Sequence, residues 1–189
     1  MKKILASLAL SLSTAFGLGL GLAPLNAAAH GPSPQKVEKS ITIKAPPAKV
    51  WALVKDFGNL HAWHPAIVST KLEQKKDDSG TMATFRTLKL KDGGEIYEKL
   101  RSIDDAAMKI KYEIISGVAP VADYNAYMIV TAGPAAGEST VSWTGRFYRT
   151  YKLNPPIPAG QDDETAVKFV NGVFDSGLAN LKKVAESSK

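Results

Sequence analysis

The stretch VWALVKDFGNLHAWHP, residues Val50–Pro65, combines a helical pattern with a cluster of aromatic and imidazole side chains, and it decides the fold of this chain. Four apolar residues recur in it at helical spacing: Val50, Trp51, Val54 and Phe57. This spacing predicts a short helix that packs one face on a core. A second brief helical turn is expected around Asn59–Trp63, and Pro65 ends it because proline disfavours helical backbone in the residue before it.

The chain on either side of this segment alternates between apolar and polar residues, which is typical of half-buried strands. Val37–Ala45 forms the first strand, and Pro46 and Pro47 end it and can begin the helix. Six further strands are expected at Ile67–Gln74, Thr81–Leu90, Glu95–Ile103, Lys109–Ser116, Asp123–Ala132 and Ser139–Arg149. The short separators are rich in Gly, Asp and Pro, the residues of turns, and therefore indicate antiparallel neighbours.

A long amphipathic helix is predicted at the C-terminal end. Asp162 follows a proline-rich loop and is expected to cap the first turn. An apolar stripe at a period of 3.6 then continues to about Ser187, formed by Ala166, Val170, Val173, Phe174, Leu178, Leu181 and Ala185. The order of elements predicts an α+β domain in two layers, in which a curved seven-stranded antiparallel sheet surrounds the long helix.

The N-terminal residues have the pattern of a signal peptide. Lys2 and Lys3 precede an apolar run, and Ala27–Ala29 provides the small residues that signal peptidase reads, so cleavage is expected after Ala29. The alternative is an uncleaved membrane anchor, which the glycines of the run and Pro24 disfavour. We therefore expect a signal peptide at 1–29, a flexible tail at 30–36, one domain at 37–187, a periplasmic location and no stable membrane anchor.

The charge and the cysteine content limit the classes of function. Two of the 24 Lys and Arg residues lie in the signal peptide, which leaves 22 basic and 18 acidic residues and a formal charge of +4. The basic residues are scattered among acidic ones, whereas a nucleic-acid site would gather them on one face. No nucleic-acid partner is therefore expected. The chain has no cysteine, so the domain must be held together by its own core.

Together with the order of elements, three short motifs carry a family resemblance: Val50–Trp51, Asp56–Phe57 and Trp63–His64–Pro65. The chain from about Val37 to Glu186 resembles the SRPBCC superfamily of START and Bet v 1-like helix-grip proteins, and within it the polyketide cyclase/dehydrase-like group. With its signal peptide, it is most similar to the exported MxaD-type accessory proteins of periplasmic methanol oxidation. One fold serves many functions, so the resemblance specifies the fold more closely than the activity.

The resemblance implies a largely apolar pocket between the sheet and the C-terminal helix. Read against it, strand alternation places Ile96, Glu98 and Leu100 on an inward face. The residues expected to contact a ligand are His64, Glu98, Tyr112, Tyr124, Met128, Trp143, Phe147 and Phe169. The aromatic members of this set could equally be ordinary packing residues of the sheet and helix.

His64 and Glu98 form the polar pair that the resemblance places inside the pocket. A buried carboxylate without a partner is costly, so an imidazole or a water molecule opposite Glu98 is expected. The pair could bind a ligand or act as a general acid and base, and these two residues are the only catalytic candidates. The alternative is structural, with His64 packed against Trp63 and Pro65 at the rim and Glu98 bridged by water.

No cofactor and no metal are expected. His61 and His64 are three residues apart, but Pro65 argues against a continuous helix there and no third ligand has suitable spacing. His30 would become the mature N-terminus, where amine and imidazole can hold copper, but no second histidine is placed beside it. The sequence has no nucleophile motif and no phosphate-binding glycine loop.

The leading hypothesis is an exported protein that binds a small apolar ligand or a protein partner and, by resemblance, assists methanol oxidation. The partner would be a periplasmic dehydrogenase or a c-type cytochrome, toward which a mildly basic protein could be steered. One alternative is an enzyme of cyclase or dehydratase type that uses His64 and Glu98. Another is a carrier of a lipid or a quinone.

Overall fold

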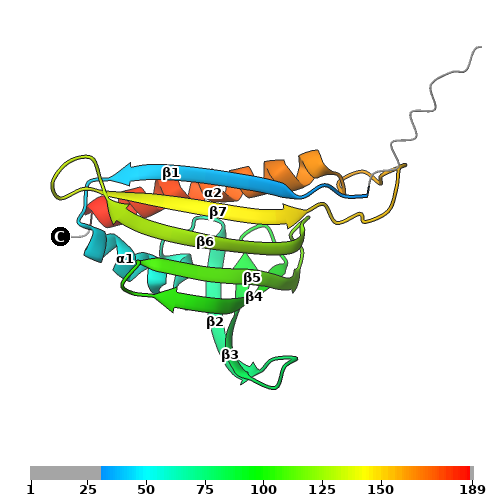
Figure 1. Ribbon diagram of the computed structural model, residues 1–189, viewed down its shortest axis with the longest axis horizontal. Helices are drawn as coiled ribbons and strands as arrows, with labels where there is room; N and C mark the ends of the chain where they lie inside the picture. The colour runs from blue at the N-terminus through cyan, green and yellow to red at the C-terminus, as the bar shows by residue number, and fades with distance from the viewer. Residues whose placement is uncertain (1–30, 188–189) are drawn as a thin grey trace, which may run out of the picture.

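The computed structural model describes residues 31–187, so the predicted signal peptide and His30 lie outside the described residues. Figure 1 shows a sheet of long strands with one long helix behind it. In chain order the elements are β1 (Gln35–Ile43), α1 (Pro47–Lys55), the 3₁₀ turn η1 (Leu60–Ala62), β2 (Ile67–Lys76), β3 (Met82–Leu90), β4 (Glu95–Asp104), β5 (Lys109–Gly117), β6 (Ala122–Ala132), β7 (Ser139–Tyr148) and α2 (Asp163–Ser187). The predicted α+β class and seven-stranded sheet are confirmed.

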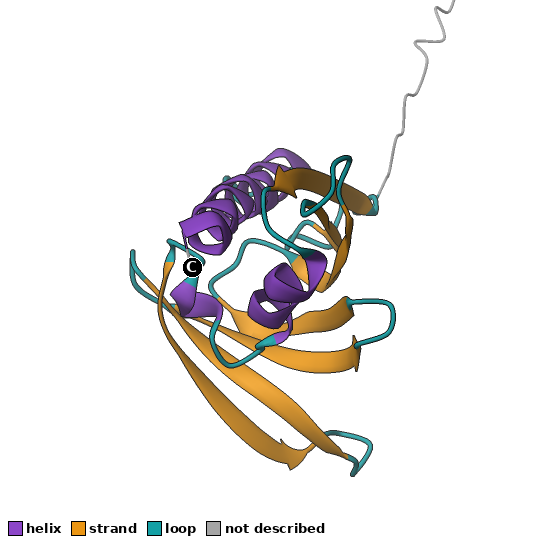
Figure 2. Ribbon diagram, turned by 90° about the vertical axis from the view of Figure 1, so that its left-hand side faces the viewer, coloured by secondary structure: helices purple, strands orange, loops and turns teal. Residues whose placement is uncertain are grey.

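The seven strands form one antiparallel sheet in the order β1-β7-β6-β5-β4-β3-β2. Each strand from β2 to β7 pairs with its chain neighbour through a short connection, and β1 pairs with β7. Figure 2 shows that the sheet curves, with the helices inside the curve. Helix α2 packs on β1 and β7, and α1 packs against β5, β6 and β7. The space between α2 and the strands from β3 to β5 is therefore left to side chains.

The Val50–Pro65 segment closes one end of this arrangement. Val50, Trp51 and Val54 of α1 are buried, as their helical spacing predicts. The indole Nε1 of Trp51 donates a hydrogen bond of 2.7 Å to Asp105, in the turn between β4 and β5. Phe57, just after α1, is also buried. This half of the segment therefore fixes α1 to the sheet.

The predicted ends of the elements coincide with the observed ones or differ from them by no more than two residues. The largest correction concerns the N-terminal tail, because β1 begins at Gln35 and its first two residues, Gln35 and Lys36, pair with Phe147 and Arg146. These two residues belong to the sheet and not to the expected tail. Asp162 caps α2 as predicted, since its Oδ1 accepts a hydrogen bond of 2.7 Å from the backbone N–H of Thr165.

Among residues 31–187, no helix combines the length and the apolar character that crossing a lipid bilayer requires.

Candidate ligand-binding cavity

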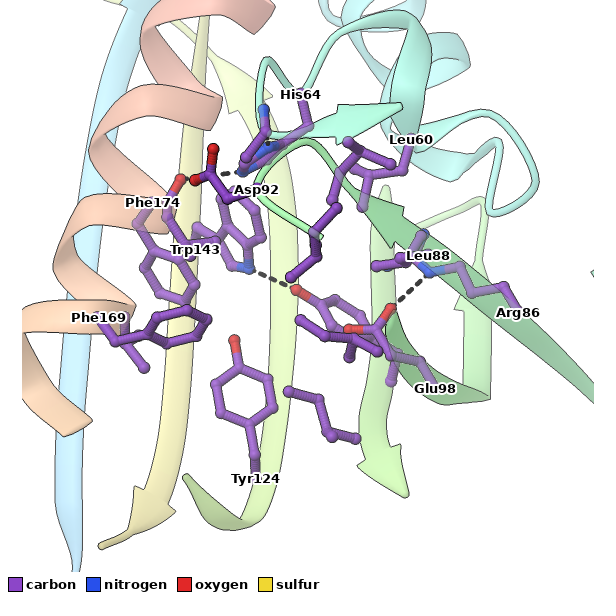
Figure 3. Close-up of a pocket in the computed structure, with 18 residues that line it drawn as sticks. Leu60, His64, Arg86, Leu88, Asp92, Glu98, Tyr124, Trp143, Phe169 and Phe174 are labelled. Atoms are coloured by element: carbon purple, nitrogen blue, oxygen red, sulfur yellow. Dashed lines mark hydrogen bonds and ion pairs between the residues drawn. The ribbon is translucent and has the colours of Figure 1, made fainter. Parts of the chain in front are cut away.

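A cavity of about 150 Å³ lies between the concave face of the sheet and α2. Figure 3 shows the side chains that surround it. Most of the wall is apolar: Leu60, Ala66, Ile67, Leu88, Leu90, Ile96, Ile114, Trp143, Phe169, Val170, Val173 and Phe174. Six polar or ionisable residues complete it, namely His64, Arg86, Asp92, Glu98, Tyr112 and Tyr124. The volume matches that of a cavity known to hold one benzene molecule, so a single ring fits.

Arg86 and Glu98 form a buried ion pair in the wall of this cavity. The two residues face each other in the β3–β4 register, and Arg86 Nε donates a hydrogen bond of 2.5 Å to Glu98 Oε2. Both side chains are about 95% buried. Burial raises the pKa of the Glu98 carboxyl, and the positive charge of Arg86 opposes this shift. The other carboxylate oxygen, Oε1, accepts no hydrogen bond from the described residues, so it is free to accept one from a ligand.

The guanidinium of Arg86 makes three contacts besides its ion pair with Glu98. Its Nη1 donates a hydrogen bond of 3.1 Å to the backbone carbonyl of Phe57. Its central carbon lies 4.0 Å from the ring centre of Phe57 and 5.1 Å from that of Tyr112. These contacts compensate for the loss of water around a buried cation. Arg86 therefore links the Val50–Pro65 segment to the wall of the cavity.

Two tyrosines and a tryptophan form the next part of the wall. The indole Nε1 of Trp143 donates a hydrogen bond of 2.8 Å to the hydroxyl oxygen of Tyr112, which leaves the Tyr112 proton available for another acceptor. The hydroxyl of Tyr124 points into the cavity (Figure 3). Burial raises the pKa of both tyrosines well above the usual value, so both stay neutral. Gly145 leaves room for Tyr124, because a Cβ there would lie 3.3 Å from its hydroxyl oxygen.

His64 is fixed as a neutral imidazole by two backbone groups. Its Nε2 lies 3.1 Å from the carbonyl oxygen of Val173 in α2, and the backbone N–H of Ala66 donates a hydrogen bond of 3.3 Å to Nδ1. A carbonyl can only accept, so Nε2 carries the proton and Nδ1 is the acceptor. Burial lowers the pKa of His64 to about 4. Both ring nitrogens are therefore occupied, and neither is left for a ligand or for proton transfer.

The close approach of His64 to α2 depends on Gly177. A Cβ at this position would lie 2.7 Å from Cδ2 and 2.9 Å from Nε2 of His64, and 2.9 Å from Cζ3 of Trp143. The rings of Trp143 and Phe174 stack on each other with their centres 4.3 Å apart. The glycine in the middle of a helix thus makes space for an aromatic cluster at the end of the cavity.

The expected pairing of His64 with Glu98 does not form. Glu98 pairs with Arg86 and His64 pairs with the helix backbone, because a guanidinium supplies the opposite charge that a buried carboxylate requires. The structural alternative for His64 is therefore closer to its observed role. Of the expected ligand-contacting residues, six line the cavity: His64, Glu98, Tyr112, Tyr124, Trp143 and Phe169.

Two residues of the expected set lie outside the cavity wall. The ring of Phe147 is completely buried and stacks on Tyr124 from behind, with the ring centres 6.0 Å apart. Met128 lines a separate void of about 10 Å³. Both residues lie on the inner face of the sheet, as the alternation of side chains predicts. The alternation does not show how far along a strand the cavity extends.

His61 and His64 do not come together. His61 is exposed, with its Nδ1 3.1 Å from the Thr70 hydroxyl, whereas His64 is buried and turned toward α2. Across residues 31–187, no cluster of three or more His, Cys, Asp and Glu side chains is arranged to hold a metal ion.

The fold and the cavity define the class of protein, which is a helix-grip domain with an internal cavity. Residues 34–186 match the family described as polyketide cyclase / dehydrase and lipid transport, and the chain belongs to this family. The expected membership of the polyketide cyclase/dehydrase-like group is thereby confirmed. No curated protein matches the chain.

Several solved structures share the fold. Protein XoxI from Bacillus cereus is 28% identical with a TM-score of 0.65, covering 80% of this chain and 96% of that one. A START superfamily protein from Mycobacterium smegmatis is 12% identical with a TM-score of 0.60, covering 80% and 97%. The Zhui aromatase/cyclase from Streptomyces sp. R1128 is 14% identical with a TM-score of 0.61, covering 82% and 94%. At 12% and 14% identity, the last two show the fold alone. The family description is consistent with a ligand-binding or cyclase-like function.

Proposed function

We propose that this protein binds a small, mainly apolar ligand about the size of one ring in the cavity between the sheet and α2. The observation that carries the proposal is an apolar cavity of about 150 Å³ with hydrogen-bonding groups at one wall. Ligand sites commonly combine an apolar lining with a few polar groups that fix the orientation of the ligand. Here those groups are Glu98 Oε1, the hydroxyl proton of Tyr112 and the hydroxyl of Tyr124.

The part of the ligand inside the cavity is uncharged. Arg86 and Glu98 already neutralise each other, and a further charge in an apolar cavity would cost several kcal/mol or more without a partner. A neutral hydroxyl, carbonyl or amine on the ring can reach the polar wall instead. A ring with one such group satisfies both the volume and the hydrogen-bonding pattern.

The test is binding of phenol, followed through the indole N–H signal of Trp143 in a ¹H–¹⁵N spectrum. Trp143 lines the cavity and donates to Tyr112, so a ligand that reaches the polar wall should shift its signal in a saturable way. Phenol and cyclohexanol test the same volume with different ring shapes. Absence of any saturable shift with both compounds would refute the proposal.

We propose the periplasm as the location and methanol oxidation as the process that the protein assists. This part of the proposal is supported by the sequence of residues 1–29 and by the resemblance to MxaD-type proteins. The partner would then be a dehydrogenase or a c-type cytochrome. Affinity capture from the periplasm of cells grown on methanol should recover one of these proteins, and growth on methanol should slow after deletion of the gene. Neither protein recovered and unchanged growth would contradict it.

A cyclase-like activity is the second candidate. It is favoured by the free Oε1 of Glu98 and by the hydroxyls of Tyr112 and Tyr124, since all three residues line the cavity. Such an activity would depend on Glu98, since both nitrogens of His64 are occupied. The Zhui aromatase/cyclase shares the fold, which adds support at the level of architecture. If the variant Glu98→Gln retains full turnover of a substrate that the unmodified protein cyclises, Glu98 has no catalytic role.

A further inference from the structure

An open groove of about 480 Å³ runs along the outside of α2 next to the cavity. Its lining residues are Ala66, Pro120, Thr165, Lys168, Phe169, Gly172, Val173 and Ser176. Three of them, Ala66, Phe169 and Val173, also line the cavity. One layer of side chains therefore separates the cavity from the groove.

Phe169 is the largest side chain in this layer. Its ring points into the cavity in Figure 3, and the residue is only partly buried. A phenylalanine side chain has two rotatable bonds, so a change of rotamer is enough to move the ring. Rotation of Phe169 would join the cavity to the groove without movement of the helix backbone.

The groove offers room and one positive charge. Gly172 is exposed, and a Cβ added there would meet nothing within 4 Å. Lys168, one turn earlier on α2, is exposed and forms no ion pair with a residue of the described chain. No Asp or Glu lines the groove, whereas the acidic Asp92 lines the cavity. The groove therefore favours an anionic group, and the cavity disfavours it.

We infer that the cavity and the groove together form a two-part site for an amphipathic anion, whose ring occupies the cavity and whose anionic group lies at Lys168. This inference rests on the proposed ligand-binding function and extends it to a substrate class. A cavity the size of one benzene molecule holds a single ring, so the rest of a larger ligand has to lie outside the cavity. A charged end gains by staying in the open groove, where water still solvates it.

The test compares 4-phenylbutyrate with 4-phenylbutanol, which have the same ring and linker but differ in charge. Binding is measured at pH 7 through the Trp143 indole signal, with phenol as a probe of the cavity alone. Lys168→Gln should weaken the binding of 4-phenylbutyrate by about two- to fivefold, which corresponds to the energy of an exposed ion pair. The binding of 4-phenylbutanol and of phenol should stay unchanged. Lys183→Gln removes a similarly exposed lysine from the same helix and should change none of the three.

Gly172→Trp tests the groove by filling it. It should weaken the binding of both phenylbutyl compounds by roughly tenfold, which corresponds to about 50 Å² of lost apolar contact, and leave the binding of phenol unchanged. If phenol binds but Lys168→Gln affects the acid and the alcohol equally, or Gly172→Trp affects neither, the two-part site is refuted and the cavity proposal stands. If phenol does not bind the unmodified protein, the proposed function itself fails.

Discussion

Gly177 and His64 are in direct contact across the interface between α2 and the loop that follows η1, and a Cβ on Gly177 would lie 2.9 Å from the imidazole Nε2. The contact places the imidazole against the carbonyl of Val173. It joins two positions that are 113 residues apart in the chain, and it fixes the end of the cavity where the Val50–Pro65 segment meets the helix.

Replacement of Gly177 by alanine should therefore destabilise the protein although alanine is the better helix former. Overpacking against His64 and Trp143 outweighs the gain in helix propensity, and we expect a net loss of about 1–2 kcal/mol. Gly172→Ala is the matched control on the same helix, since its Cβ meets nothing, and it should stabilise by up to about 1 kcal/mol. Urea unfolding measures both, and equal effects would show that the contact is not tight.

The stability of the protein should fall on acidification through the titration of His64. Its pKa is lowered to about 4 in the folded state from 6.5, so below pH 6.5 the unfolded chain binds more protons than the folded one. Between pH 7 and pH 5 this difference removes about 2 kcal/mol of stability.

Glu98 has a raised pKa and therefore contributes a pH dependence of stability of the opposite sign. The variant His64→Gln is needed to isolate the contribution of the imidazole. The variant should lose less stability than the unmodified protein between pH 7 and pH 5. Parallel stability curves for the two proteins would mean that His64 keeps its ordinary pKa.

The Arg86–Glu98 pair should behave as a coupled buried ion pair. Arg86→Met leaves a buried carboxylate without its partner and is expected to cost about 3–5 kcal/mol. Arg86→Met combined with Glu98→Leu should be less destabilising than Arg86→Met alone, because no unpaired charge remains. A double-mutant cycle by chemical unfolding gives the coupling energy, and additive effects would contradict the pairing.

Neighbouring residues on β5 separate the inside of the sheet from its outside. Ile114 lines the cavity, whereas Ile115 is exposed on the opposite face. Ile114→Phe should fill part of the cavity and abolish phenol binding with a stability change of no more than about 1.5 kcal/mol. Ile115→Phe is the matched control and should bind phenol as the unmodified protein does; loss of binding in both variants would place phenol elsewhere.

The sequence predicted the elements and six of the residues that line the cavity, because strand alternation and turn residues are local signals. The register of the β3–β4 hairpin carried one further signal that was missed. The turn at Asp92–Gly94 pairs Lys89 with Glu95, which sets Arg86 directly opposite Glu98 on the same face. Opposite charges at facing positions on an inward face predict an ion pair, and this would have identified Arg86 as the partner.

Other parts of the site could not be read from local patterns. Gly177 lies within the long amphipathic helix, and only the packing of α2 against the loop after η1 shows why a side chain is excluded there. The extent of the cavity along β6 and β7, which leaves Met128 and Phe147 outside its wall, depends on the curvature of the whole sheet.

The central claim is that the cavity holds a small ligand, and native mass spectrometry of the protein purified from the cells that produce it tests this most directly. The account predicts one or a few discrete bound molecules of low mass on the unmodified protein and on Ile115→Phe. It predicts that Ile114→Phe, which fills the cavity, is recovered without them. Recovery of the same bound molecules on Ile114→Phe, or of none on the unmodified protein under gentle conditions, would contradict it.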